Sequence, residues 1–275
     1  MPCIVFTDLD GTLLNGETYA YQAALPTLAK LTERGIPVVP VTSKTRQEVA
    51  QLRHDVGLRD PFVVENGSAI YIPTNSPTGQ SRFALPPGDD ADGYRVLQLG
   101  CNYVTARAGL KAIAQDLGRP LKGFGDWSID QVVQLTGLSP AEAKQAKARE
   151  FTEPFMTPKN VPADQLREAV EAMGFRVVIG DRFSHLIGAA AGKGNAVHQL
   201  VKLYQASSPG PVTTIGLGNS PNDLDMLENV DYPIVLPGAH GPHPRLADRG
   251  WAIAPAPAPD GWAMAVEKVL AQVAI

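Results

Sequence analysis

Short, continuously apolar segments alternate with helical patterns in the first part of the chain. The apolar segments are Ile4 to Phe6, Ile36 to Val41 and Phe62 to Val64, and helical patterns at residues 23–34 and 45–54 separate them. Strands without a polar face are typical of a parallel sheet that helices cover on both sides. The sequence therefore predicts an α/β fold with a doubly wound, Rossmann-like parallel-sheet core.

This alternation is interrupted in the middle of the chain. Prolines and glycines punctuate a polar stretch between Tyr71 and Tyr94, and helices and strands then follow one another in a different order as far as Ile187. The first pattern resumes with a helix at 193–204 and strands at 212–217 and 233–236. We therefore predict a core domain of residues 1–83 and 188–275, with residues 84–187 inserted as an α+β cap domain.

Local signals support elements inside the insertion and after it. Ser139-Pro140-Ala141-Glu142 has the form of a capping box that begins a helix, and a helix at 163–173 should end on Gly174. The run 175–180 indicates a strand. The alternating alanines and prolines at 254–259 predict an extended connector on the surface.

Composition excludes several functional classes. The 275 residues are 44% hydrophobic and 19% charged, as in ordinary soluble proteins, and the net charge of −4 opposes binding to nucleic acid. Cys3 and Cys101 have no spacing typical of a metal site or a disulfide framework. No export signal or membrane span is indicated, so we expect a cytoplasmic protein with a small-molecule partner. The oligomeric state is left open.

An acidic pair follows the first apolar segment. Asp8 directly succeeds a predicted strand, and Asp10 projects to the same side while the backbone stays extended. Parallel sheets bind ligands at the carboxyl ends of their strands. Two converging carboxylates need a counter-charge, which Mg²⁺ can supply while it holds phosphate oxygens. Taken alone, the pair could equally be an acidic turn.

Three further polar motifs lie at predicted strand ends or helix starts. They are Thr42-Ser43-Lys44, Lys193 between two glycines, and Asn219 to Asp223. Hydroxyls and helix-opening amides can hold phosphate, and the lysine can offset negative charge. Each motif has an ordinary alternative, namely a helix cap, a surface lysine or a turn. Their shared position at one sheet edge favours a single site.

The order of these motifs resembles the haloacid dehalogenase superfamily of phosphatases. Asp8-Leu9-Asp10-Gly11-Thr12 looks like the first motif, Thr42 the second, Lys193 the third and Gly218 to Asp223 the fourth. The resemblance covers the whole chain. It implies that the insertion between the second and third motifs is a type 2 cap.

Further segments look most like those of mannosyl-3-phosphoglycerate phosphatases. They are Val41 to Thr45, Glu65-Asn66-Gly67, Arg149 to Phe155, Arg182 to Leu186 and Gly218 to Leu224. The resemblance implies a Mg²⁺-dependent phosphatase that hydrolyses mannosyl- or glucosyl-3-phosphoglycerate. A phosphatase for sucrose phosphate or glucosylglycerol phosphate, and a non-catalytic sugar-phosphate-binding protein, are the alternatives.

The resemblance also implies residue roles. Asp8 would be the nucleophile, Asp10 the general acid and base, and Lys193 a stabiliser of phosphoryl charge. The metal ligands would be Asp8, Asp10 and Asn219, with Asp223 completing the metal shell directly or through water. Arg149 or Arg182 would bind the glycerate carboxylate, and Glu65 or His185 the sugar hydroxyls. The remaining expected substrate or phosphate contacts are Thr42, Ser43, Lys44, Asn66, Ser184 and Asn222.

Two positions depart from the family pattern. Asn219 stands where the family usually has an aspartate, and Ala191-Gly192 stands where an acidic residue commonly precedes the lysine. An asparagine carbonyl can still ligate Mg²⁺, but one negative charge is lost. We therefore predict weaker metal binding.

Overall fold

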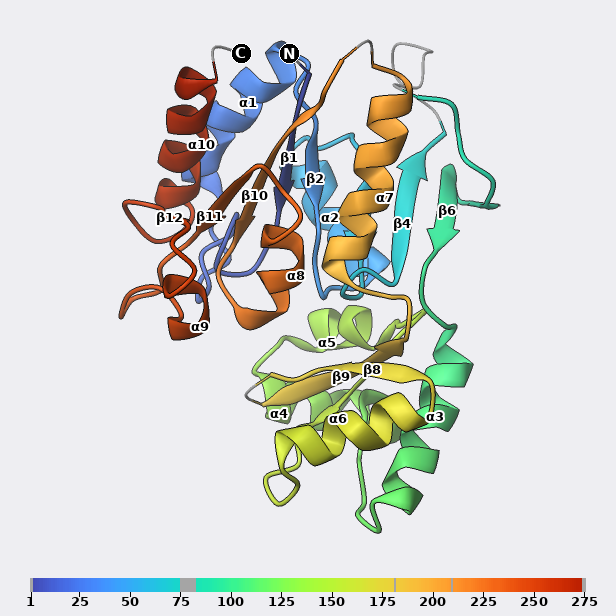
Figure 1. Ribbon diagram of the computed structural model, residues 1–275. Coiled ribbons are helices and arrows are strands. Elements are labelled where there is room, and N and C mark those ends of the chain that lie inside the picture. Colours follow the sequence, from blue (N-terminus) through green and yellow to red (C-terminus); the bar gives the residue numbers. More distant parts are fainter. Residues whose placement is uncertain (1, 75–82, 181, 209, 274–275) are drawn as a thin grey trace.

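The computed structural model describes residues 2–74, 83–180, 182–208 and 210–273 of the chain. Figure 1 shows a larger α/β module that contains both ends of the chain and a smaller module built from its middle part. Residues 75–82, within the stretch predicted to separate core and cap, lie outside the described residues.

Five parallel strands form the centre of the larger module, in the order β12-β11-β10-β1-β2. They are β1 (Cys3–Thr7), β2 (Val38–Pro40), β10 (Thr213–Gly218), β11 (Tyr232–Val235) and β12 (Ala252–Ile253). Every residue of β1 is buried, as its unbroken apolar sequence requires of a strand covered on both faces. The predicted parallel α/β core is therefore confirmed.

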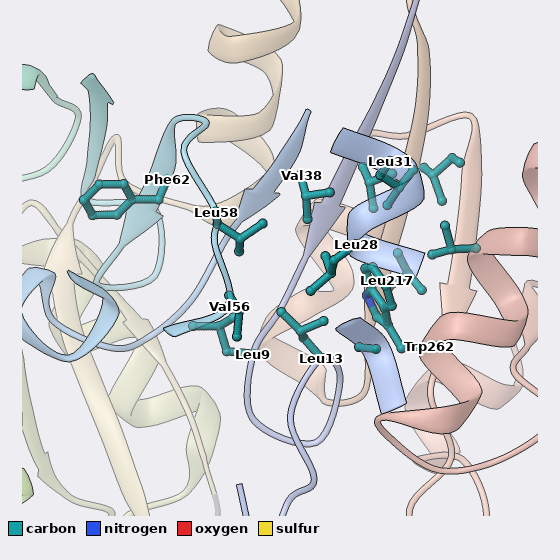
Figure 2. Packing of buried hydrophobic residues seen from close by; sticks show 14 of the residues in the cluster. Leu9, Leu13, Leu28, Leu31, Val38, Val56, Leu58, Phe62, Leu217 and Trp262 are labelled. Carbon is teal, nitrogen blue, oxygen red and sulfur yellow. The ribbon is translucent and has the colours of Figure 1, made fainter. Parts of the chain in front are cut away.

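Helices cover both faces of this sheet (Figure 1). One face packs against α1 (Leu25–Glu33), α2 (Arg46–Asp55) and α10 (Asp260–Gln272), the other against α7 (Lys193–Ala206), α8 (Leu224–Leu227) and α9 (Pro244–Ala247). Figure 2 shows Leu28, Leu31 and Trp262 packed beside Val38 and Leu217. Each such side chain contributes about 1.5–3 kcal/mol on burial. This packing fixes the strand ends that carry the polar motifs.

A second sheet extends the first. The strand β3 (Phe62–Val64) meets the chain after β2 through a parallel bridge between Val41 and Val63. From β3 the order continues as β4 (Ala69–Pro73), β6 (Tyr94–Gln98) and β5 (Asp89–Ala91), with antiparallel pairing. Since β6 pairs with β4, we propose that the first boundary lies near residue 100 and not between residues 83 and 84. The second boundary at residues 187 and 188 stays a prediction.

The smaller module is an α+β cap, as predicted. Its helices are α3 (Tyr103–Asp116), α4 (Ile129–Thr136), α5 (Pro140–Lys147) and α6 (Ala163–Ala172). Its antiparallel sheet has the order β7-β9-β8, with β7 (Glu153–Met156), β9 (Phe183–Gly188) and β8 (Phe175–Val178). Leu110 of α3, Leu166 of α6 and Leu186 of β9 belong to one buried cluster, so these two helices cover one face of the cap sheet.

The predicted local signals are present in the cap. Ser139 and Glu142 form the capping box that begins α5, and Gly174 has the left-handed φ of +77° that follows α6. The prediction of a surface connector at 254–259 is only partly right, because Ala254 and Ala258 are buried against the core. In the described parts of the chain, no helix combines the length and apolar character needed to cross a bilayer.

Candidate active site

The structure brings the four predicted motifs to one edge of the parallel sheet. Asp8 follows β1, Thr42 follows β2, Asn219 follows β10, and Lys193 opens α7 beside them. The N–H of Asp8 donates to the carbonyl of Leu217 over 2.9 Å, which continues the pairing of β1 with β10 up to the acidic residue. Neighbouring parallel strands thus deliver side chains that are far apart in sequence to one point.

A buried cation lies between two carboxylates at this point. Lys193 Nζ donates to Asp8 Oδ1 over 2.7 Å and to Asp223 Oδ1 over 2.6 Å. The exposed fractions are 2% for Lys193, 6% for Asp8 and 0% for Asp223, so water screens these charges weakly. A surface lysine is therefore excluded for Lys193.

The charges in this cluster do not balance. Burial and the charge of Asp223 raise the pKa of Asp8 to about 7, although Lys193 acts in the opposite direction. Burial alone would lower the pKa of Lys193, but the charges of Asp223 and Asp8 outweigh it and keep this pKa above its ordinary value. One excess negative charge makes the site receptive to a cation.

Both carboxylate oxygens of Asp223 accept hydrogen bonds. Its Oδ1 binds Lys193, and its Oδ2 accepts the backbone N–H groups of Asn219 and Ser220, each over 3.0 Å. This arrangement favours contact with a metal through water over direct ligation, and the role of Asp223 in the metal shell stays a prediction. The residue also orients the turn that presents Asn219.

Asn219 lies against the loop that carries the acidic pair. Its Oδ1 accepts a hydrogen bond from Thr12 Oγ1 over 3.1 Å. A Cβ atom on Gly11, whose φ is +74°, would come within 2.4 Å of Asn219 Nδ2. Glycine at this position therefore permits both the turn after Asp10 and the close approach of Asn219.

Asp10 forms an ion pair on one oxygen only. Its Oδ2 lies 2.9 Å from Lys44 Nζ, and the ring of Tyr19 lies 5.2 Å from the same ammonium. Its Oδ1 is buried and has no hydrogen-bond partner in the described parts of the chain. An unpaired buried carboxylate oxygen is costly and fits a metal ion or a substrate group.

The oxygens of this site are of the kind that Mg²⁺ prefers as ligands. Carboxylate and amide oxygens are the donors that this hard cation prefers, and Asp8, Asp10 and Asn219 present them from adjacent strand ends. Within the described residues, no group of three or more His, Cys, Asp or Glu side chains forms a metal-binding cluster. The donor set thus fits Mg²⁺ only if Asn219 and substrate oxygens take part.

The loop after β3 presents a second unpaired polar atom. Asn66 is 2% exposed, and its Nδ2 has no hydrogen-bond partner among the described residues, while its Oδ1 lies 3.4 Å from Asn222 Nδ2. Gly67 has a φ of +83°, and a Cβ there would lie 2.1 Å from the carbonyl oxygen of Gly192. The loop is therefore pressed against the start of α7, and Asn66 is placed as a donor beside Lys193.

The second motif, Thr42-Ser43-Lys44, forms hydrogen bonds with the core and with the cap. Thr42 is buried, and its backbone exchanges hydrogen bonds with the β3 strand and its loop, at 3.1 Å to Val63 and 2.9 Å from Asn66. Its Oγ1 accepts the N–H of Lys44 over 3.2 Å, as in a helix-start turn. Ser43 is partly exposed, and its carbonyl accepts from Arg149 Nη1 over 2.7 Å. These residues remain candidates for phosphate contact.

Glu65 does not have the predicted role. Its Oε1 accepts the N–H of Glu150 over 2.8 Å. Its Oε2 accepts from the N–H of Phe151 over 3.3 Å and from the N–H and hydroxyl of Thr152 over 2.8 and 2.7 Å. The side chain is 0% exposed and its carboxylate accepts four hydrogen bonds from the cap segment, so sugar hydroxyls do not reach it in this structure. Glu65 is a core residue that clasps the backbone of the cap segment leading into β7, and we call this contact the Glu65 clasp.

We expect Glu65→Gln to lower the free energy of unfolding by about 2–3 kcal/mol, because the new amide N–H₂ faces donors instead of accepting from them. Urea denaturation followed by circular dichroism measures the change. Glu168→Gln, at an exposed position of the cap, is the matched control. Equal stability of the two variants would contradict the role of the clasp.

The four cap residues predicted to touch substrate separate into two groups. Arg149 is nearly buried at the core boundary, and His185 has a buried Nδ1 without a partner in the described parts. Burial, Arg149 and Lys193 lower the pKa of His185, which keeps the imidazole neutral. Ser184 bonds Thr157 over 2.8 Å, and the exposed Arg182 donates to Leu135 over 2.5 Å. The last two are thus engaged within the cap.

Ser184 and His185 differ because adjacent residues of a strand face opposite sides. Ser184 shares its side with Leu186, which is buried under α3 and α6, whereas His185 shares the other side with Ile187. Sequence reasoning missed Arg176 of β8, which lies on the His185 side. Only the strand register, which no motif reveals, could have identified it.

Comparison with known proteins shows which family the chain resembles. Residues 5–85 match the haloacid dehalogenase-like hydrolases. A protein of Persephonella marina named glucosyl-3-phosphoglycerate/mannosyl-3-phosphoglycerate phosphatase is 37% identical over 270 residues, which cover 98% of both chains. The chain belongs to the haloacid dehalogenase-like hydrolase family. A similarly named protein of Methanococcoides burtonii is 38% identical to this hydrolase over 86% of the chain and 85% of its own length.

Solved structures share the fold of this haloacid dehalogenase-like hydrolase at low sequence identity. A haloalkanoate-superfamily phosphatase of Bacteroides thetaiotaomicron has a TM-score of 0.68 at 14% identity, covering 100% of this chain and 96% of its own. The sucrose-phosphatase of Synechocystis sp. PCC6803 has a TM-score of 0.61 at 19% identity, covering 99% and 98%. These structures share the capped α/β fold of this family member. The relatives, which are named phosphatases, show that it is a phosphoric monoester hydrolase.

Proposed function

We propose that this hydrolase removes phosphate from a glycosyl-3-phosphoglycerate, carrying either mannose or glucose, with the help of Mg²⁺. The names of the two relatives support this substrate class. The observation that carries the proposal is the group of unpaired buried atoms on predicted site residues, namely Asp10 Oδ1, Asn66 Nδ2 and His185 Nδ1. A folded protein leaves such atoms unpaired at a high cost unless a ligand completes them.

The reaction would proceed in two steps on the acidic pair. Asp8 attacks phosphorus with the oxygen that Lys193 does not hold, and the bond between phosphorus and the ester oxygen breaks. Asp10 donates its proton to the leaving alkoxide. In the second step Asp10 takes a proton from a water molecule, which attacks phosphorus and releases phosphate and Asp8.

The surrounding residues would hold the charge of the phosphoryl group. Lys193 stands against Asp8, Asn66 offers a free amide donor, and Ser43 lies at the start of α2. Asp8 and Asn219 would hold Mg²⁺, and Asp10 would complete the shell through its main-chain carbonyl, which leaves its carboxyl group free to carry the proton. Asp223 would act from outside the ligand shell. When bound, Mg²⁺ neutralises negative charge on the phosphoryl oxygens and the carboxylates.

The cytoplasmic location of the protein stays a prediction.

Replacing Asn219 with aspartate is expected to tighten Mg²⁺ binding by about 10-fold, since a charged ligand replaces a neutral one. Isothermal titration of the protein with MgCl₂ measures this affinity without any turnover. Asn160→Asp, at an exposed position of the cap, is the matched control. Unchanged affinity in Asn219→Asp would remove this residue from the ligand set.

The substrate proposal is tested by phosphate release from a panel. Mannosyl-3-phosphoglycerate, glucosyl-3-phosphoglycerate, sucrose phosphate and a glucosylglycerol phosphate are compared with and without Mg²⁺. We expect the highest kcat/KM for the two phosphoglycerates and a strong fall without the metal. A higher kcat/KM for a substrate that lacks glycerate would contradict the proposal and identify that sugar phosphate as the substrate. If no substrate releases phosphate, a non-catalytic binding protein is favoured.

A further inference from the structure

The cap sheet turns one face toward the core. Antiparallel pairing places Arg176 opposite Ile187 and Val178 opposite His185, so these four side chains share that face. Val177 and Leu186 share the other face, which α3 and α6 cover. The cap therefore presents a cation, Arg176, on the side where His185 has its unpaired nitrogen.

A cleft of about 340 Å³ lies between this face and the core. Its cap side includes Arg176, Val178 and Ile187, and its core side includes Asn66, Lys193 and Asn222. Asn66 contributes the buried amide donor that has no partner among the described residues. Asn66 and Lys193 line this cleft and also belong to the proposed phosphate site, so one end of the cleft borders that site.

Arg176 has hydrogen-bonding capacity to spare. Its Nη1 donates to the carbonyl of Ala191 over 2.7 Å, and its Nη2 lies 4.0 Å from Asp225 Oδ2, beyond hydrogen-bond range. The side chain is 47% exposed, so solvent or a ligand can reach it. A guanidinium has five N–H donors and favours planar, two-pronged binding of a carboxylate.

We propose that this cleft binds the carboxylate of the phosphoglycerate unit, with Arg176 as the residue that recognises it. The inference rests on the proposed function and deepens it. In the substrate, two carbons separate the carboxyl carbon from the phosphate ester oxygen, so a phosphate beside Asn66 and Lys193 leaves its carboxylate in the adjoining cleft. Arg182 is engaged elsewhere in the cap, and Arg149 is already bonded to Ser43 and Ala146. Three further arginines line the cleft: Arg167 pairs with Asp164, Arg249 pairs with Glu228, and Arg245 lies on α9 of the core. Of the arginines in this lining, Arg176 is the one that projects from the cap sheet on the side of His185.

The alternative explanation is that Arg176 only holds the cap in position and does not bind the substrate. Through Ala191, Arg176 also ties the cap to the segment that leads into Lys193. Loss of that tie would weaken turnover of every substrate equally. Loss of carboxylate recognition would weaken only the substrates that carry a carboxylate.

The experiment compares Arg176→Gln with wild type on glucosyl-3-phosphoglycerate and on the glucosylglycerol phosphate that has hydroxymethyl in place of the carboxylate. We expect kcat/KM to fall about 10- to 100-fold on the first substrate and less than about 3-fold on the second. Arg176→Lys should recover part of the loss. Arg119→Gln, an exposed arginine of the cap, is the matched control and should change neither value.

Equal losses on both substrates would overturn the proposal in favour of positioning. A second measurement separates this failure from failure of the proposed function. In an Asp8→Asn background, titration calorimetry compares binding of 3-phosphoglycerate with that of glycerol 3-phosphate. We expect tighter binding of 3-phosphoglycerate, and loss of that preference with Arg176→Gln. Equal affinity for the two ligands before the arginine is changed would also overturn the proposal, whichever sugar phosphate the enzyme hydrolyses.

Discussion

Asp8→Asn is expected to reduce phosphate release from the preferred substrate by roughly 10⁴-fold or more. Asparagine keeps the shape of aspartate and can still accept a hydrogen bond from Lys193, but its amide cannot attack phosphorus. The variant should therefore fold normally and bind substrate. Release of phosphate at saturating substrate and Mg²⁺ measures the loss.

Covalent phosphate on the protein and a control variant test whether Asp8 itself is the nucleophile. Wild-type protein quenched in acid during turnover should carry covalent phosphate, and the Asp8→Asn protein should carry none. Asp116→Asn, at an exposed position at the end of α3, is the matched control and should retain full activity. Substantial turnover by Asp8→Asn would show that another group, or water, attacks the phosphorus.

Lys193→Met should have the second largest effect, on stability as well as on activity. The change leaves Asp8 and Asp223 buried side by side without their shared cation. Removing one partner of a buried ion pair costs about 3–5 kcal/mol, and we expect the free energy of unfolding to fall by this amount. Urea denaturation measures it, with Lys111→Met on the exposed surface of α3 as the control.

The stability loss should depend on pH and on Asp223. A buried carboxylate without a cation binds a proton more readily in the folded state than in the unfolded state. The deficit of Lys193→Met should therefore be smaller at about pH 5 than at about pH 8. Adding Asp223→Asn to Lys193→Met should restore part of the stability by removing one of the two charges. A pH-independent deficit would contradict the charge-based explanation.

The sequence was sufficient to predict the catalytic edge of the sheet. Asp8, Thr42 and Asn219 each follow a segment that must be a buried strand, and parallel strands present their carboxyl ends together. The position of Lys193 at the start of a helix completed the same edge. The parallel sheet with helices on both faces followed from the same apolar periodicity, so the α/β core was predictable as well. The order of its strands was not predicted.

The cap was much less predictable, because its contacts depend on strand parity and on how two modules meet. Ser184 and His185 are neighbours in sequence, yet the pleat sends them to opposite faces. Arg176 becomes a candidate only when β8 pairs with β9 in the observed register. Glu65 carries a motif-like signature, but its carboxylate is directed to backbone amides, which have no signature in the sequence.

The Glu65 clasp has a consequence for exchanging caps between relatives. Two covalent connections attach the cap to the core, and the clasp adds a noncovalent attachment made by main-chain N–H groups of residues 150–152. Because these donors belong to the backbone, many side-chain sequences could satisfy Glu65 provided that the segment keeps its path. A chimera made to change sugar preference should therefore preserve the backbone conformation of this segment, and can vary the cap sheet and its helices around it.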